Sequence, residues 1–95
     1  MRCSERHFQA AVEELARWNR WLVFHCHNSM HSAPGFPDLC MARDGVVVFA
    51  ELKSAKGRVS PDQREWLEAL GACSGVHTYL WREPADWPQI REVLA

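Results

Sequence analysis

The sequence predicts an α/β domain with the order helix, strand, β-hairpin, helix, strand, helix, and three observations predict it. Apolar residues near the start recur at helical spacing. Asp44 and Gly45 separate two runs rich in β-formers, which is typical of a two-residue hairpin loop. The segment 60–63, Ser-Pro-Asp-Gln, combines an N-cap, a first-turn proline and a capping-box glutamine.

Three helices follow from these signals. The first covers residues 4–19, with Ser4 as a candidate N-cap. Its apolar face consists of Phe8, Ala11, Val12, Leu15 and Trp18. The second begins after Ser60, directs Trp66, Leu67 and Leu70 inward and ends between residues 71 and 75. The third is short, opens at residues 84–87 and contains Ile90, Val93 and Leu94.

Four strands are expected between the helices. Residues 21–27 form the first, and residues 28–37 form a loop rich in Pro and Gly. Residues 39–43 and 46–52 form the hairpin, and the near-continuous apolar run of its second strand predicts burial on both faces. Residues 54–59 form a charged loop, and residues 76–81 form the last strand.

The length and composition indicate a single globular domain over residues 1–95. Hydrophobic residues make up 47% and charged residues 24%, as in ordinary water-soluble domains. No apolar run is long enough for a membrane helix, and the polar start is unlike a secretory signal. The four cysteines are well separated, with no C-x-x-C pair. Their even count permits a secreted disulfide framework, but nothing else in the sequence is typical of a secreted protein, so reduced thiols in a cytoplasmic setting are expected. The net charge of -1 disfavours nucleic-acid binding by bulk charge, but not through a metal and a local basic patch.

The hairpin register brings three charged residues together. With a two-residue loop at 44–45, counting outward places Asp38 directly opposite Glu51. Lys53 lies two residues beyond Glu51 and therefore on the same face. The sequence predicts an Asp, Glu and Lys cluster at the open end of an apolar hairpin.

Such a cluster suits metal-assisted phosphodiester hydrolysis. Opposed carboxylates repel each other, and a hard divalent cation such as Mg²⁺ or Mn²⁺ removes that conflict. A neighbouring lysine can orient or help deprotonate an attacking water. On spacing alone, an exposed carboxylate pair with a solvated lysine is an equally good interpretation, since the register is inferred.

The motifs resemble those of PD-(D/E)XK nucleases. Residues 35–39, Gly-Phe-Pro-Asp-Leu, and residues 51–53, Glu-Leu-Lys, match that signature. The sequence is similar over residues 4–94 to the VRR-NUC branch, the virus-type replication-repair nucleases. The likeness includes the Phe-Ala-Glu-Leu-Lys strand, the Lys-Gly-Arg-Val-Ser-Pro connection at 56–61, Gln63, and the Tyr-Leu-Trp-Arg strand at 79–82.

The resemblance implies a restriction-endonuclease-like core, a mixed sheet flanked by helices in the order α-β-β-β-α-β-α. It also implies Mg²⁺- or Mn²⁺-dependent DNA cleavage without a nucleotide cofactor, selective for structures such as Holliday junctions, in a bacterial cell or a phage-infected host. By the same resemblance, Asp38 and Glu51 are metal ligands, the Leu52 carbonyl is a further ligand, and Lys53 is the catalytic lysine.

The family also places an acid on the first helix, where Glu5, Glu13 and Glu14 are candidates. Helical geometry puts Glu5 on the flank of the apolar face, so Glu5 is the preferred ligand. The alternative is that Glu5 only complements the helix dipole. Gln63 matches a family glutamine that could contact the metal site or DNA, but it equally completes the capping box.

Candidate DNA contacts surround the acid cluster. His27 and Asn28 are candidates in the loop before Asp38, and Arg43, Lys56, Arg58 and Arg64 together form a candidate phosphate-contacting rim. Taken singly, each of these four basic residues is more simply explained as a solvated surface charge. The family carries an acid where this chain has Asn28. A zinc site built from His25, His27, His31, Cys26 and Cys40 is disfavoured, because the ligand spacing is poor.

Two further functions remain open at this point. One is a non-catalytic DNA-binding or assembly module with the nuclease fold, which the intact Asp38, Glu51 and Lys53 set disfavours. The other is a small interaction protein, suggested by five tryptophans that cannot all be buried in 95 residues. The same exposed aromatic surface predicts a homodimer.

Overall fold

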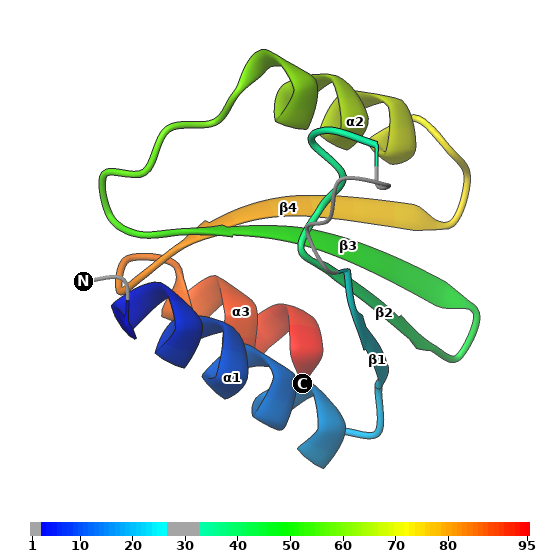
Figure 1. The fold of residues 1–95 in the computed structure, drawn as a ribbon. Coiled ribbons are helices and arrows are strands. Elements are labelled where there is room, and N and C mark those ends of the chain that lie inside the picture. Colours follow the sequence, from blue (N-terminus) through cyan, green and yellow to red (C-terminus); the bar gives the residue numbers. More distant parts are fainter. Residues whose placement is uncertain (1–2, 27–32) are drawn as a thin grey trace.

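The computed structural model describes residues 3–26 and 33–95, which form helices on both faces of a four-stranded sheet (Figure 1). The elements are α1 (Cys3–Trp18), β1 (Leu22–His25), β2 (Leu39–Arg43), β3 (Val46–Lys53), α2 (Pro61–Gly71), β4 (Val76–Arg82) and α3 (Trp87–Leu94). The strand order is β1-β2-β3-β4. β1, β2 and β3 are antiparallel neighbours and β4 is parallel to β3, so the sheet is mixed as expected.

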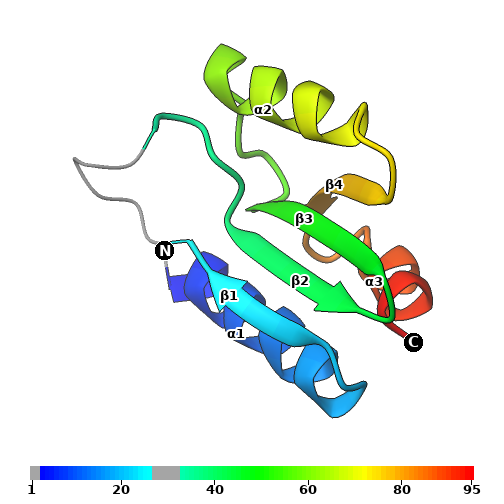
Figure 2. The ribbon, with the colours of Figure 1, turned by 90° about the vertical axis from the view of Figure 1, so that its right-hand side faces the viewer.

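Helices α1 and α3 cover one face of the sheet and form the main core with it (Figure 2). α1 contributes Phe8 and Val12, and α3 contributes Ile90 and Leu94, all almost fully buried. The sheet contributes Leu39, Met41, Val48, Ala50, Leu52 and Trp81. Alternate residues of each strand point to this face, which agrees with the period of two in the sequence.

Helix α2 lies over the other face, against β3 and β4 (Figure 1). The Trp66 ring meets the Phe36 ring edge-on, with centroids 4.9 Å apart, and Phe36 meets Phe49 in the same way at 5.6 Å. No α2 side chain is fully buried, so the expected inward residues Trp66, Leu67 and Leu70 are only half-buried. The prediction that β3 is buried on both faces is wrong for this reason: α2 leaves Val47 and Phe49 partly open.

Several element boundaries differ from the sequence predictions; α1, for example, spans Cys3–Trp18 rather than residues 4–19. β1 ends at His25 rather than 27, and residues 27–32 lie outside the described part of the chain. β4 continues to Arg82, whose backbone N–H donates to the Asp86 carboxylate at 2.8 Å. That contact closes a turn over residues 83–86, so α3 begins at Trp87 rather than Pro84. In the described residues, no helix is long and apolar enough to cross a membrane.

Helix α1 ends in a Schellman-type C-cap, and it does so without glycine. The Trp21 backbone N–H donates to the Ala16 carbonyl at 3.0 Å, and the Arg20 N–H donates to the Arg17 carbonyl at 3.0 Å. Arg20 therefore occupies the left-handed position, with φ of 70°. Trp21 then enters the core at 5% exposure, and its indole N–H donates to the Leu94 carbonyl.

Gly35 joins the loop before β2 to the first turn of α2. Its φ is +87°, and a Cβ built on it would lie 2.5 Å from the Asp62 backbone carbon. Gly45 has a similar φ of +82° but open space around it. Gly35→Ala is expected to destabilise the fold by about 2–4 kcal/mol, because the left-handed strain and the backbone clash add.

Gly45→Ala is the matched control, since it carries the left-handed strain alone, about 1–2 kcal/mol. Urea unfolding of both variants measures the difference. Equal destabilisation would show that the close approach of Gly35 to α2 has no energetic importance.

Candidate active site

The β2–β3 hairpin places Asp38 beside β3, where the sequence puts it. The observed register pairs Leu39 with Ala50 and Arg43 with Val46, which is the expected alignment. The Asp38 carboxylate accepts a hydrogen bond from the Leu52 backbone N–H at 2.9 Å, and the Asp38 carbonyl accepts one from the Cys26 N–H. Both bonds fix Asp38 at the end of the strand pair.

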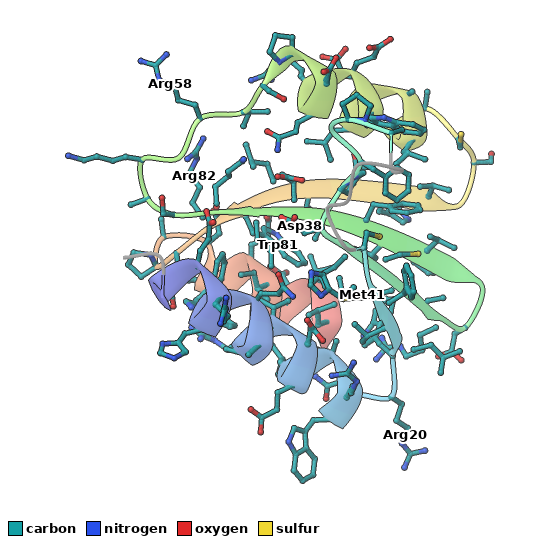
Figure 3. All side chains as sticks on the ribbon, in the orientation of Figure 1. Arg20, Asp38, Met41, Arg58, Trp81 and Arg82 are labelled. Carbon is teal, nitrogen blue, oxygen red and sulfur yellow. The ribbon has the colours of Figure 1, made fainter. Side chains whose placement is uncertain are left out.

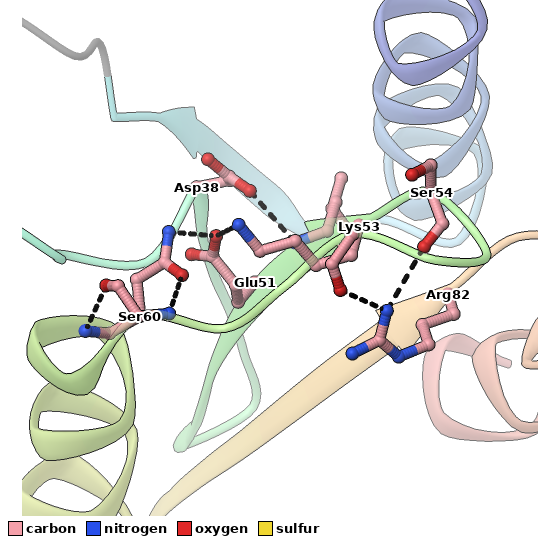
Figure 4. A network of polar contacts seen from close by, with 9 residues as sticks. Asp38, Glu51, Lys53, Ser54, Ser60 and Arg82 are labelled. Carbon is pink, nitrogen blue, oxygen red and sulfur yellow. Dashed lines mark hydrogen bonds and ion pairs between the residues drawn. The ribbon is translucent and has the colours of Figure 1, made fainter.

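Glu51 is the buried polar residue at the centre of the site, with 2% exposure (Figure 4). Its Oε2 accepts a hydrogen bond from Gln63 Nε2 at 2.9 Å and lies 3.4 Å from Lys53 Nζ. Its Oε1 is buried and has no hydrogen-bond partner among the described residues. Buried oxygens without partners are rare in proteins, and a functional role often explains them.

Both carboxyl groups have raised pKa values. Burial, followed by the charge of Asp38, raises the pKa of Glu51 to about 7, although Lys53 opposes the shift. Burial also raises the pKa of Asp38, against the Leu52 N–H bond and the charge of Lys53. The fold therefore keeps two carboxylates together at an electrostatic penalty that one ammonium group does not remove.

Gln63 has both of its predicted roles at once: it completes the capping box and it contacts the acid cluster. Its side-chain oxygen accepts from the Ser60 N–H at 2.9 Å, and its backbone N–H donates to Ser60 Oγ at 3.1 Å, which completes the capping box. Its amide Nε2 remains available for Glu51. The cap thus orients the amide group toward the acid cluster.

Among the first-helix acids, Glu5 lies nearest the site. It lines a hollow of about 310 Å³ together with Asp38 and Leu52, and its charge acts on the pKa of Asp38 and Glu51. The Glu5 side chain is solvent-exposed, so it lies at the rim rather than in the interior. Glu13 instead pairs with Arg17 at 3.2 Å. Glu14 is exposed on the outer face of α1.

The residues present fit a cation that keeps part of its water shell. Asp38 and Glu51 offer hard oxygen donors, one of them the orphaned Oε1. The Lys53 carbonyl accepts from the Glu83 N–H on the β4 side, so the Leu52 carbonyl faces the opposite side, that of Asp38. The described residues contain no group of three His, Cys, Asp or Glu that could hold a metal unaided. Water or substrate oxygens would complete the coordination.

The basic residues divide into two groups. Lys56 and Arg58, in the loop after β3, and Arg64 on α2 are exposed, and Arg58 points away from the body of the protein (Figure 3). Arg43 is at the other end of β2, next to the hairpin turn. It donates to the Asn19 and Ala95 carbonyls at 2.8 and 2.9 Å and lies over the Trp21 ring.

The expected place of Arg43 in a rim beside the acids therefore does not fit its position. It is a structural contact between α1, the hairpin and the end of the chain. His27 and Asn28 lie outside the described residues.

Several residues near the site were not singled out from the sequence. Arg6 and Gln9 line the same hollow as Asp38, together with His25, which the sequence indicated only as a ligand of the disfavoured zinc site. Gln9 lies one helical turn after Glu5, so helical spacing alone could have indicated it. Arg82 lies opposite Lys53 and donates to the Ser54 and Gly57 carbonyls, which anchors the loop after β3 (Figure 4). No sequence signal indicates that contact.

The disfavoured zinc site gains no support from the described residues. Cys26 and Cys40 are free thiols, and burial raises the pKa of both. Neither they nor His25 belong to a group of three potential ligands in this part of the chain. His27 and His31 are not described.

Comparison with known proteins agrees with this geometry. The profile of the VRR-NUC domain family matches residues 3–82, which include all the elements from α1 to β4. A solved structure described as a VRR_NUC domain protein superimposes with a TM-score of 0.66 at 20% sequence identity, over 95% of this chain and 84% of that chain. Curated protein sequences give no match. With its family match over most of its length, the chain belongs to the VRR-NUC family of nuclease domains.

Proposed function

We propose that the protein is a Mg²⁺- or Mn²⁺-dependent endonuclease that hydrolyses phosphodiester bonds in DNA. The observation that carries this proposal is the Glu51 carboxylate, buried beside Asp38 with one oxygen unpartnered and a pKa of about 7. If Glu51 had only a structural role, the folded protein would be more stable with an uncharged residue at this position. Binding of a divalent cation would offset the electrostatic penalty of the two neighbouring carboxylates and so gives the buried charge of Glu51 a function.

Each residue has a distinct role in this proposal. Asp38, Glu51 and the Leu52 carbonyl hold the cation, and Glu5 contributes from the rim through water. When bound, the cation supplies Lewis acidity and an activated water. Lys53, with a side chain only 15% exposed, orients the attacking water and offsets charge that develops on the phosphate. Gln63 holds Glu51 in place through its amide.

We further propose that the substrate is branched or structured DNA, such as a Holliday junction, in bacterial or phage replication and repair in the cytoplasm. The exposed Lys56, Arg58 and Arg64 support phosphate contacts beside the acids. His27 and Asn28 stay as predicted DNA contacts. Selectivity for DNA structure would come from the loops around the acids and from a second copy.

A homodimer is part of the same proposal. Leu22 and Phe24 are 78% and 64% exposed and lie on the same face of β1, which is an edge strand of the sheet. Exposed apolar residues on an open edge favour pairing with another chain. Light scattering should give twice the mass of one chain at micromolar concentration. The mass of one chain throughout that range would refute the dimer.

The nuclease proposal is tested by incubating the protein with four-way junction, flap, duplex and single-stranded DNA. Each substrate is tested with Mg²⁺, with Mn²⁺ and with EDTA. Cleavage of at least one substrate with either metal, and none with EDTA, is expected. Binding without cleavage of any substrate would favour the non-catalytic DNA-binding module, and cleavage in EDTA would contradict the metal role.

The two functions of Gln63 can be separated by substitution. Ser60→Ala removes the cap alone and is expected to lower stability by about 1 kcal/mol, with little change in cleavage per folded molecule. Gln63→Ala keeps the backbone bond to Ser60 Oγ but removes the side-chain half of the capping box and the Glu51 contact, so cleavage should fall about tenfold or more. Cleavage rates well below the melting temperature of both variants measure this. Equal rates for the two variants would assign Gln63 to the cap only.

A further inference from the structure

A second, wide-open hollow lies along the outer face of α1 beside the candidate active site and is lined only by α1 and the turn after it. It has a volume of about 720 Å³ and shares Arg6 and Gln9 with the smaller hollow that contains Asp38. It extends to Trp18 and Arg20 at the far end of the helix. From Arg6 to Trp18 the helix rises about 18 Å, enough for several nucleotides of an extended strand.

Trp18 ends this path as an exposed aromatic platform. It is 76% exposed, whereas Trp21 and Trp81 are buried in the core. An exposed indole contributes little to folding, but it can stack on any unpaired base. A base in a duplex presents only its edge, so a ring in this position selects for single-stranded nucleic acid.

The charge of the path is positive although the chain carries a net charge of -1. Three arginines line it, at positions 6, 17 and 20, against two glutamates. One of these, Glu13, is already engaged by Gln9 at 2.9 Å and by Arg17 at 3.2 Å. The Arg17 side chain still has 58% of its surface exposed. Local positive charge beside a phosphodiester-cleaving site favours binding of a nucleic-acid backbone.

Arg20 holds a position that its backbone does not favour. The left-handed C-cap residue, with φ of 70°, is the place where glycine or asparagine is most stable. Its side chain points out from the end of α1 (Figure 3). An arginine at this position is therefore better explained by contact with a ligand in the solvent than by stabilisation of the helix end.

We infer that the outer face of α1 binds a single-stranded arm of the DNA substrate as it leaves the active site. Trp18 stacks on a base, and Arg6, Arg17 and Arg20 contact the phosphates. This inference rests on the proposed nuclease function, because it assigns a substrate part to the same site. The ligand is single-stranded DNA, and α1 selects for substrates that carry a single-stranded arm.

Binding is tested first, in EDTA, so that cleavage is not required. Fluorescence anisotropy of labelled oligothymidylate is measured for the wild type, Trp18→Leu and Trp18→Phe. Trp18→Leu keeps an apolar helix former but loses the ring, and should weaken binding about tenfold. Trp18→Phe keeps a ring and should lose less than about threefold. Equal affinity of Trp18→Leu and the wild type would overturn the inference.

The arginine contact has its own signature. Arg20→Asn suits the left-handed position, so its melting temperature should equal or exceed that of the wild type. Its binding should nevertheless weaken, with the slope of log affinity against log salt reduced by about 0.7. Arg91→Asn, which replaces an exposed arginine on α3, is the control and should change neither the binding affinity nor the salt slope. An unchanged slope for Arg20→Asn would contradict a phosphate contact.

Cleavage then separates this inference from the proposed function. Duplexes with single-stranded arms of increasing length, on either strand, are compared with blunt duplex. Trp18→Leu should slow cleavage only of substrates whose arm is long enough to reach Trp18. If armed and blunt substrates are cut and Trp18→Leu slows neither, the inference fails while the nuclease proposal stands. If nothing is cut but the arm still binds through Trp18, the nuclease proposal fails alone.

One alternative occupant of this face is a second protein chain. Light scattering of Trp18→Leu distinguishes it from DNA. An unchanged mass together with weaker oligothymidylate binding supports the DNA path. A change in mass that accounts for the weaker binding would assign Trp18 to a protein interface and overturn the inference.

Discussion

Replacing Glu51 by glutamine is expected to raise the melting temperature of the metal-free protein by roughly 10–20 °C at about pH 9. The reason is the raised pKa of Glu51, about 7 in the folded protein against an ordinary value of 4.5. Below pH 4.5 the carboxyl group is neutral in both folded and unfolded chains, and its burial has no ionisation penalty. As the pH rises from 4.5 through about 7, the unfolded chain ionises first, so the folded state loses stability.

The loss amounts to about 3 kcal/mol once Glu51 is ionised in both states. The amide introduced by Glu51→Gln has no such pH dependence, and its oxygen can still accept from the Gln63 amide. Thermal unfolding of the wild type and Glu51→Gln between about pH 5 and pH 9, in EDTA, measures the gap between the two curves. Glu68→Gln, an exposed acid on α2, is the control and should track the wild type. A gap that stays constant with pH would contradict the proposed penalty.

Cleavage should respond in the opposite direction. Asp38→Asn, Glu51→Gln and Lys53→Ala are each expected to lower the rate at least about 1,000-fold, because each removes several kcal/mol of transition-state stabilisation. Glu51→Gln would then be the more stable and the less active protein. Single-turnover rates on the best DNA substrate, with Mg²⁺ in excess, measure the effect. Glu68→Gln should cut at the wild-type rate.

A variant of the three that retains the wild-type rate would exclude its residue from the proposed chemistry. The three effects should not add in combined variants, since the residues act as one unit. Asp38→Asn combined with Lys53→Ala is therefore expected to lose little more than either single variant. Multiplicative losses would indicate independent roles instead.

The sequence predicted the centre of the site because a local signal sets it. The Asp44-Gly45 turn determines the hairpin register, and the register brings Asp38 alongside Glu51 and Lys53. The capping box in the same way predicted where α2 begins. Signals of this kind depend on residues close together in the chain, so a single sequence contains them in full.

Contacts between segments that are distant in the sequence could not be predicted from such local signals. Arg43 was expected beside the acids, but its partners Asn19 and Ala95 directly follow α1 and α3. The dual role of Gln63 depends on how α2 sits above β3, and the incomplete burial of β3 depends on what α2 leaves uncovered. Each of these follows from packing between layers, for which the hydrophobic pattern gives only the face and not the partner.

Direct binding of Mn²⁺ distinguishes a metal centre at Asp38 and Glu51 from a buried structural acid. Calorimetric titration of Mn²⁺ into the wild type and into Glu51→Gln, both at about pH 8, measures it. Binding to the wild type, weakened at least about 100-fold in Glu51→Gln, is the expected result. Equal Mn²⁺ affinity in the two proteins, or no binding to the wild type, would contradict a metal-dependent nuclease centre at this carboxylate pair.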